Sequence, residues 1–181
     1  MAKLFLMVGP TCAGKTTYSR RVYPAHWILN FDEIREDLGE SDQELVFRAL
    51  YDLAKTRLLY DLPTVIDAWN LERSARLRFT KLSEEVVYVV IDRPLPEKLK
   101  SLEGRSAHVV MQEHLKFHNN LTEILAGDNL PHVKIADRRS TGGEVRVVVP
   151  ESVAAVHVTG PQRKPPSVVA ELRFSSDRYD P

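Results

Sequence analysis

Cysteine is almost absent from this sequence of 181 residues, in which Cys12 is the only one. A single thiol cannot form a disulfide within the chain, and such low cysteine use is typical of proteins in a reducing compartment. Long apolar runs are missing too. The run near the N-terminus stops at Gly9-Pro10, which is too short for a signal-peptide core or a membrane span. We therefore expect a cytoplasmic protein with no membrane partner.

The chain also lacks a net charge, because 25 basic residues balance 25 acidic ones. Bulk electrostatic attraction therefore cannot be the main means of binding nucleic acid, and any such binding has to come from a local basic patch. The hydrophobic content of 43% is sufficient for a real core. The length fits one domain of ordinary size, alone or with an appendage.

Against this background one motif stands out, because Gly9 to Thr16 reads GPTCAGKT, a complete G-x-x-x-x-G-K-[ST] phosphate-binding loop. Its glycines allow backbone angles that turn successive N–H groups toward a polyphosphate, and the helix expected from Lys15 adds the positive end of its dipole. Lys15 is placed to reach the β- and γ-phosphates, and the Thr16 hydroxyl can ligate Mg²⁺. The nucleotide-binding residues that we predict are Gly9, Thr11, Cys12, Ala13, Gly14, Lys15, Thr16 and Thr17.

The alternative for this motif is an ordinary glycine-containing turn between a strand and a helix. The apolar run before the loop has the length of a strand, and residues 15–22 can continue as a helix. This order of strand, loop and helix is the context that a phosphate-binding loop requires. We therefore predict that the chain binds a nucleoside triphosphate.

Short apolar runs alternate with helical patterns along the chain. Runs of strand length occupy residues 3–8, 27–30, 64–67, 86–91 and 132–136. Helical patterns occupy residues 15–22, a segment from a Ser41–Glu44 capping box to about 61, residues 71–82 and residues 107–117. Such alternation predicts an α/β fold with a mainly parallel central sheet and helices on both faces.

The character of the chain changes after the fourth apolar run. Residues 93–105 are charged and are interrupted by Pro94, Pro96 and Gly104. Nucleotide kinases keep a lid at this place between the fourth and fifth strands, although a plain solvated connection would also fit the composition. We expect the lid at about 93–118, a main domain at 1–138 and an extension of unknown role at 139–181, in which 144–149 could pair with the fifth strand.

Carboxylates follow the second and third predicted strands. Asp32 and Asp67 should lie close to the phosphate-binding loop, because ligands of open parallel sheets bind outside the carboxyl ends of the strands. Asp32 and Arg35 are spaced as D-x-x-R, which places a carboxylate and a guanidinium on one face of a helical turn. Such a pair can accept a proton from a hydroxyl and hold an anionic substrate. A surface ion pair is the alternative, and the loop upstream argues against it.

Four segments in order, GPTCAGKT, ILNFDEIR, VIDAWNLERSARLR and a basic lid, resemble the kinase domain of phage-type polynucleotide 5′-kinases and their bacterial end-healing relatives over about residues 3–136. The resemblance implies a P-loop kinase fold. It implies that Asp32 is the general base for the 5′-hydroxyl, that Arg35 engages the acceptor phosphate, and that Asp67 supports the acceptor site. It also implies a lid arginine at the transferring phosphoryl group, for which we choose Arg105 over Arg93.

Two further features leave alternatives open. The helix expected after Asp67 carries four basic residues near Trp69, which could bind a nucleic-acid strand or form a solvated face beside a core tryptophan; the four are Arg73, Arg76, Arg78 and Lys81. His114 and His118 are four residues apart on an expected helix, a spacing that permits metal binding. Since the H-E-x-x-H pattern is missing, we expect an ordinary surface pair and no zinc site.

The sequence thus predicts a phosphotransferase that uses ATP or another nucleoside triphosphate and Mg²⁺, with an alcohol group as acceptor. The most specific hypothesis is a polynucleotide 5′-hydroxyl kinase acting on DNA or RNA ends. Its expected catalytic residues are Lys15, Asp32, Arg35, Asp67 and Arg105. One alternative is a P-loop kinase for a nucleoside, a small molecule or a hydroxymethylated base in DNA. Another is a nucleotide-dependent switch, which would not need a base for a hydroxyl.

Overall fold

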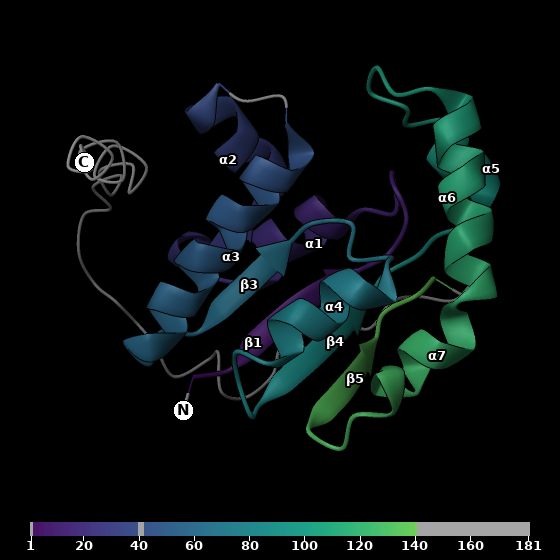
Figure 1. The fold of residues 1–181 in the computed structure, drawn as a ribbon. Coiled ribbons are helices and arrows are strands. Elements are labelled where there is room, and N and C mark those ends of the chain that lie inside the picture. The colour runs from purple at the N-terminus through teal and green to yellow at the C-terminus, as the bar shows by residue number, and fades with distance from the viewer. Residues whose placement is uncertain (1, 40–41, 141–181) are drawn as a thin grey trace.

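A parallel sheet of five strands forms the centre of the protein. The computed structural model describes residues 2–39 and 42–140 (Figure 1). The strands run in the order β2-β3-β1-β4-β5, and every neighbouring pair is parallel. They are β1 (Leu4–Val8), β2 (Ile28–Asn30), β3 (Thr64–Asp67), β4 (Val86–Val90) and β5 (Val133–Asp137). The α/β fold with a parallel sheet is therefore confirmed, and all five strands lie within one or two residues of the predicted ranges.

Helices connect the strands. They are α1 (Lys15–Val22), α2 (Phe31–Leu38), α3 (Gln43–Leu59), α4 (Arg73–Thr80), α5 (Leu95–Leu99), α6 (Ala107–Asn119) and α7 (Leu121–Leu125). The sequence predicted α1, α3, α4 and α6 at about these places, whereas α2, α5 and α7 were not among the predicted helices. Single 3₁₀ turns occupy Ala25–Trp27 and Gly127–Asn129. Over residues 2–39 and 42–140, none of the helices is both long and apolar enough to cross a membrane.

The start of α3 differs from the prediction of a capping box between Ser41 and Glu44. The N-cap is Asp42, whose Oδ1 accepts the backbone N–H of Glu44 at 2.8 Å, so the helix begins at Gln43. An aspartate satisfies the free N–H groups of a first turn as well as a serine does, and the sequence offered both side by side. Ser41 lies outside the described residues. The helix ends at Leu59, two residues before the expected end near Asp61.

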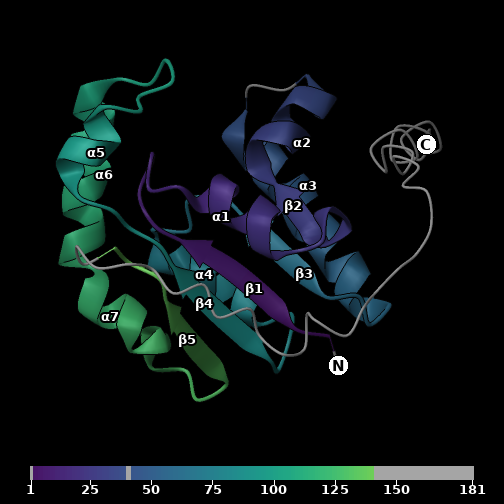
Figure 2. The ribbon, with the colours of Figure 1, turned by 180° about the vertical axis from the view of Figure 1, so that it is seen from behind.

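Alternation along β1 divides the core into two layers. Leu4, Leu6 and Val8 pack on one face of the sheet with buried side chains of α2, α3, α4, α6 and α7. Phe5 and Met7 pack on the other face with Val22 and Tyr23, at the end of α1. In Figure 1 α3 and α4 lie in front of the sheet, and in Figure 2, which shows the molecule from behind, α1 lies in front. Helices therefore cover both faces, as predicted.

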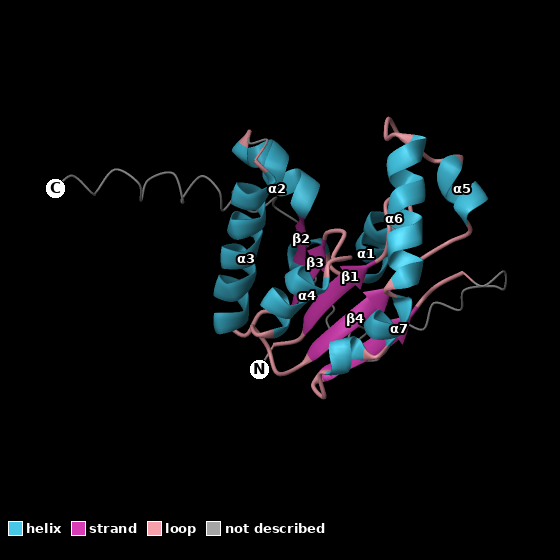
Figure 3. Ribbon diagram, turned by 45° about the vertical axis from the view of Figure 1, so that its right-hand side comes forward, coloured by secondary structure: helices cyan, strands magenta, loops and turns pink. Residues whose placement is uncertain are grey.

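The segment between β4 and β5 contains three helices, α5, α6 and α7, and is more than a plain connection. Its second helix, α6, was expected at 107–117 and extends to Asn119. Figure 3 shows α2 with the start of α3 on one side and α5 with α6 on the other, both rising beyond the carboxyl ends of the strands. This is the position expected of a lid. The division of the chain near residue 138 stays a prediction, and the possible strand at 144–149 lies outside the described residues.

A buried ion pair joins α4 to the connection before β5. Nε and Nη2 of Arg76 donate to the Asp128 carboxylate at 2.8 and 2.6 Å, and the Tyr88 hydroxyl of β4 donates to the same carboxylate at 2.7 Å. Arg76 and Asp128 are 0% exposed. Burial alone would lower the pKa of Arg76, but the hydrogen bonds and charge of Asp128 outweigh burial and raise it. This network ties the helical layer to the sheet.

Asp128→Asn is expected to lower the free energy of unfolding by about 3–5 kcal/mol, because removing one partner of a buried pair leaves an uncompensated charge in the interior. Asparagine keeps the shape of the side chain and tolerates the φ of 53° at this position. Urea unfolding followed by circular dichroism measures the change.

Glu33→Gln is the matched control for this measurement. The distance from Arg20 Nη2 to Glu33 Oε1 is also 2.6 Å, but these side chains are 60% and 58% exposed. Exposed pairs contribute about 1 kcal/mol or less. A loss in Asp128→Asn no larger than the loss in Glu33→Gln would contradict a stabilising role for the buried network.

Candidate active site

The phosphate-binding loop between β1 and α1 has the backbone that its sequence predicted. A Cβ at Gly9 would overlap the carbonyl oxygen of Ile91, the residue after β4, so only glycine lets the loop pass this close to the sheet. Gly14 adopts φ 94° and ψ 19° at the N-cap of α1, a left-handed conformation that glycine favours. The two motif glycines therefore serve different purposes. One permits a close approach and the other permits the turn into the helix.

Lys15 bonds to the loop that carries it. Its Nζ donates to the carbonyl oxygens of Gly9 and Pro10, both at 2.9 Å. Burial lowers the pKa of Lys15, while the nearby carboxylates of Asp67 and Glu113 act in the opposite direction. The ammonium group of Lys15 therefore lies within the loop and close to the carboxylates of Asp67 and Glu113. It can exchange these two carbonyl contacts for phosphate oxygens.

Asp67 connects three elements at the carboxyl edge of the sheet. Its carboxylate is buried, with the residue 3% exposed. Its Oδ2 accepts hydrogen bonds from Asn30 Nδ2 at 2.8 Å and from Ser19 Oγ at 3.3 Å. Asn30 also caps α2, because its Oδ1 accepts the backbone N–H of Glu33 at 3.0 Å. Sequence reasoning missed Asn30, although an asparagine directly before a helix is a recognisable N-cap signal.

Asp32, Arg35 and Arg105 converge from two separate elements. Arg35 Nη2 lies 3.2 Å from Asp32 Oδ1 within α2, and Arg105 Nη2, from the connection between α5 and α6, lies 3.9 Å from Asp32 Oδ2. The three side chains are between 42% and 52% exposed. An acidic group flanked by two guanidinium groups and open to solvent is suited to an anionic ligand that carries a hydroxyl.

Arg93 lies elsewhere and bonds to the phosphate-binding loop. Its Nε donates to the carbonyl oxygen of Cys12 at 2.7 Å. This contact supports a loop residue with positive φ, since Cys12 has φ 60°. The two candidate lid arginines thus occupy different places, with Arg105 beside Asp32 and Arg93 under the loop. The assignment of Arg105 to the transferring phosphoryl group stays a prediction.

A carboxylate from α6 contacts the phosphate-binding loop. Glu113 Oε2 accepts the backbone N–H of Thr11 at 2.7 Å. Backbone N–H groups of this loop are the donors that a phosphate would use. Glu113 therefore holds α6 against the loop with an interaction that resembles the one a phosphate oxygen makes. The sequence gave no signal of this contact, because the two residues are 102 positions apart.

The basic helix after Asp67 is not a continuous basic surface. Arg76 is fully buried against Asp128, Arg73 pairs with Glu123 at 2.9 Å, and Arg78 pairs with Glu44 at 3.3 Å. The four basic residues could not be distinguished in the sequence, but in the structure Arg76 is buried and the others are not. Most of the charge is neutralised by acidic partners, which weakens the interpretation of this helix as a strand-binding face.

Trp69 lies at the mouth of a cavity rather than in the core. The cavity has a volume of about 230 Å³ and lies between α2, α3 and the start of α4, with Phe31, Phe47, Asn70 and Arg78 among its lining residues. Trp69 is 40% exposed, and the Arg78 guanidinium lies 5.3 Å from the centre of the Phe47 ring. The cavity adjoins Phe31, the neighbour of Asp32 in α2. It therefore lies beside the helix that carries Asp32.

A family model described as an AAA domain, AAA_33, matches residues 4–124, from β1 into α7. The chain belongs to the AAA_33 family. The match includes the phosphate-binding loop, Asp32, Asp67 and Arg105, and with the five-stranded parallel sheet it gives a P-loop kinase fold. Such a fold implies nucleotide binding. A comparison with curated proteins finds no match.

Two solved structures share this fold. A chain in the Pnkp1/Rnl/Hen1 RNA repair complex aligns with a TM-score of 0.59 and 18% identity, over 67% of this chain and 46% of that one. This chain thus spans less than half the length of that relative. A sugar kinase from a Janibacter species aligns with a TM-score of 0.50 and 18% identity, over 77% of this chain and 86% of that one. At these identities the likeness shows the fold alone.

Glu113→Gln is expected to tighten ATP binding, because it removes a negative charge from the place where phosphates approach the Thr11 N–H. Repulsion between charges near a protein surface is on the order of 1 kcal/mol or more, which corresponds to a Kd about fivefold lower. Isothermal titration of the nucleotide measures the change. Glu97→Gln, which removes the same charge from an exposed position on α5, should leave the Kd unchanged. Weaker ATP binding in Glu113→Gln would contradict the interpretation.

Proposed function

We propose that this chain is an ATP- and Mg²⁺-dependent kinase that transfers the γ-phosphate to the 5′-hydroxyl of a nucleic-acid end. The observation that carries the proposal is the convergence of Asp32, Arg35 and Arg105 at the edge of the sheet that also bears the phosphate-binding loop. A nucleotide switch has no use for a carboxylate placed to accept a proton. A kinase for an alcohol group requires one.

The donor side consists of the loop and its lysine. The loop N–H groups and Lys15 would hold the β- and γ-phosphates, with Lys15 giving up its contacts to the carbonyls of Gly9 and Pro10. The residues fit Mg²⁺, because Thr16 lies in the first turn of α1 and the hydrogen bonds from Ser19 and Asn30 to Asp67 both go to Oδ2 and not to Oδ1. When bound, Mg²⁺ neutralises charge on the phosphates.

The acceptor side consists of Asp32 and the two arginines. Asp32 would accept the proton of the attacking hydroxyl, for which its exposed carboxylate is accessible. Arg35, one helical turn further on, would hold the phosphate that follows the terminal nucleoside, because a guanidinium presents several fixed donors to phosphate oxygens. Arg105 would neutralise charge on the transferring group after leaving Asp32.

Three observations support a nucleic-acid end as the acceptor. The ordered motifs resemble those of polynucleotide 5′-kinases, and one structure of the same fold comes from an RNA repair complex. The cavity beside Trp69 adds an aromatic side chain on which a base could stack. The shared fold of a sugar kinase supports a small-molecule kinase as the second candidate. The acceptor experiment below separates the two.

Asp32→Asn is expected to lower kcat by about 10²–10⁴-fold while the Kd for ATP stays the same, because an amide cannot accept the proton of the hydroxyl. The measurement is transfer of labelled γ-phosphate to a 5′-hydroxyl oligonucleotide, with ATP binding measured separately. Glu33→Gln removes the neighbouring carboxylate of the same helix and should keep the wild-type rate. Unchanged turnover in Asp32→Asn would show that Asp32 serves only as a partner of Arg35.

The proposed acceptor is tested by comparing kcat/KM for a nucleoside and for its 3′-phosphate. We expect the 3′-phosphate to be preferred by about 10–100-fold in the wild type, since hydrogen bonds to charged groups contribute about 1.5–3 kcal/mol. Arg35→Ala should remove most of this preference. Arg20→Ala, which removes another exposed arginine paired with a carboxylate, should retain it. Equal values in the wild type would identify a nucleoside or small-molecule kinase instead.

A further inference from the structure

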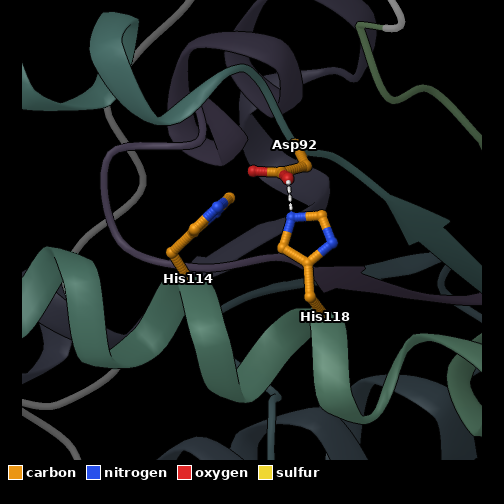
Figure 4. Close-up of side chains that lie close together, drawn as sticks. All are labelled: Asp92, His114 and His118. Carbon is orange, nitrogen blue, oxygen red and sulfur yellow. Dashed lines mark ion pairs between the residues drawn. The ribbon is translucent and has the colours of Figure 1, made fainter.

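A cluster of three side chains that can bind a metal lies between α6 and the end of β4. His114 and His118 are one turn apart on α6 and point toward Asp92, which lies shortly after β4 (Figure 4). One ligand atom from each residue lies within 4.8 Å of the others. The sequence showed the histidine pair, for which we expected no metal. It did not show that the fold adds a carboxylate to the pair.

The geometry of the cluster suits a small divalent cation. His118 Nε2 lies 3.2 Å from Asp92 Oδ2. Two ligand atoms at about 2.0–2.2 Å from a tetrahedral Zn²⁺ are separated by roughly this distance. Imidazole nitrogen and carboxylate oxygen are both ligands that Zn²⁺ accepts, and three protein ligands leave one position for water. Asp92 is 7% exposed, whereas His118 is 45% exposed and offers a route from solvent.

The contact with Lys98 indicates that Nδ1 of His114 carries a free electron pair. Lys98 Nζ lies 2.6 Å from His114 Nδ1. An ammonium group can only donate, so Nδ1 has to accept and carries no proton. Burial, followed by the charges of Lys98 and His118, lowers the pKa of His114, although Asp92 acts in the opposite direction. An imidazole nitrogen without a proton is the form that binds a metal.

Lys98 supplies the positive charge that now balances Asp92. Its Nζ donates to Asp92 Oδ1 at 2.6 Å, and the side chain is 0% exposed. The ammonium group thus contacts two of the three ligand residues. A metal ion would need the same Nδ1 lone pair, so metal and ammonium compete for His114. The four-carbon chain of Lys98 is flexible, so its ammonium group can move away when a divalent ion neutralises the Asp92 carboxylate in its place.

We propose that Asp92, His114 and His118 form a binding site for a divalent transition metal such as Zn²⁺, at which the metal replaces the ammonium group of Lys98. The site is separate from the proposed Mg²⁺ position at Thr16 and does not depend on the identity of the acceptor. Residues next to the site on both of its elements contact the phosphate-binding loop. Glu113 precedes His114 and accepts the Thr11 N–H, and Arg93 follows Asp92 and donates to the Cys12 carbonyl. Bound metal would therefore fix the lid helix against the end of β4.

The proposal is tested on the full chain after treatment with a chelator and without nucleotide. Co²⁺ is titrated in as a spectroscopic probe, and Zn²⁺ is then added to displace it. We expect one saturable site with the visible absorption of tetrahedral Co²⁺. We also expect a higher midpoint of thermal unfolding with Zn²⁺, because a ligand that binds only the folded state stabilises it.

Four variants make the test specific. His114→Ala and His118→Ala should each weaken Co²⁺ binding by about 100-fold or more. Mutating residues that only hydrogen-bond to metal ligands typically weakens metal binding by about 10–100-fold, and loss of a ligand should cost more. His108→Ala, which removes an exposed histidine from the same helix, should have no effect. Lys98→Met should strengthen binding about tenfold or more, because the competing ammonium group is gone while the length of the side chain is kept.

Several outcomes would overturn the proposal. One is the absence of saturable binding in the wild type, and another is equal affinity in His114→Ala and His108→Ala. A sulfur-to-cobalt charge-transfer band would place the metal on Cys12 instead. Unchanged affinity in Lys98→Met, with a normal unfolding midpoint, would disprove the exchange between metal and lysine. Since the histidine variants alter partly exposed side chains, their folding can be verified by the same thermal measurement.

Discussion

The arrangement of the site depends on the buried carboxylate of Asp67. Ser19 of α1 and Asn30 at the end of β2 both donate to its Oδ2, and Asn30 also caps α2. One carboxylate at the end of β3 therefore sets the position of the helix after the phosphate-binding loop relative to the helix that carries Asp32. Leaving a buried carboxylate without hydrogen-bond donors costs free energy. The hydrogen bonds from Ser19 and Asn30 are therefore both favoured, because each satisfies the Asp67 carboxylate. The proposed donor side and the proposed acceptor side are thereby linked through one carboxylate.

Contiguous signals were sufficient to predict most of the fold. The phosphate-binding loop is a single run of residues, and β3 lies at Thr64–Asp67 as predicted because Pro63 and the polar turn at Trp69–Asn70 delimit an apolar run. The parallel sheet followed from the alternation of such runs with helical patterns. Even the lid helix was recognisable within two residues of its end. These features depend on neighbours in the sequence, where periodicity and turn chemistry act directly.

What the sequence did not show are contacts between distant side chains. Arg76 belongs to a pattern that reads as a solvated face, and only its partner Asp128, 52 positions away, explains its burial. Glu113 and Asp92 likewise gain their significance from residues on other elements. Periodicity indicates which side of a helix is apolar, but it does not identify the partner of a charged residue. The sequence pointed to candidate site residues in or beside a motif, such as Lys15, Asp32 and Asp67, but it gave no signal of the contacts that Glu113 and Asp92 make with other elements.

The ion pair between Arg105 and Asp32 has a consequence for the proposed chemistry. It joins the lid to α2 across the acceptor side, at 3.9 Å and between half-exposed groups, so it is weak and easily broken. While it persists, the carboxylate is partly occupied and less able to activate a water molecule. In the proposed mechanism an acceptor that carries its own phosphate offers Arg35 a stronger anionic partner, as the transferring phosphoryl group does for Arg105, and the base is then free to meet the hydroxyl. The enzyme would thus avoid wasting ATP by hydrolysis, because its base becomes available when the correct alcohol arrives.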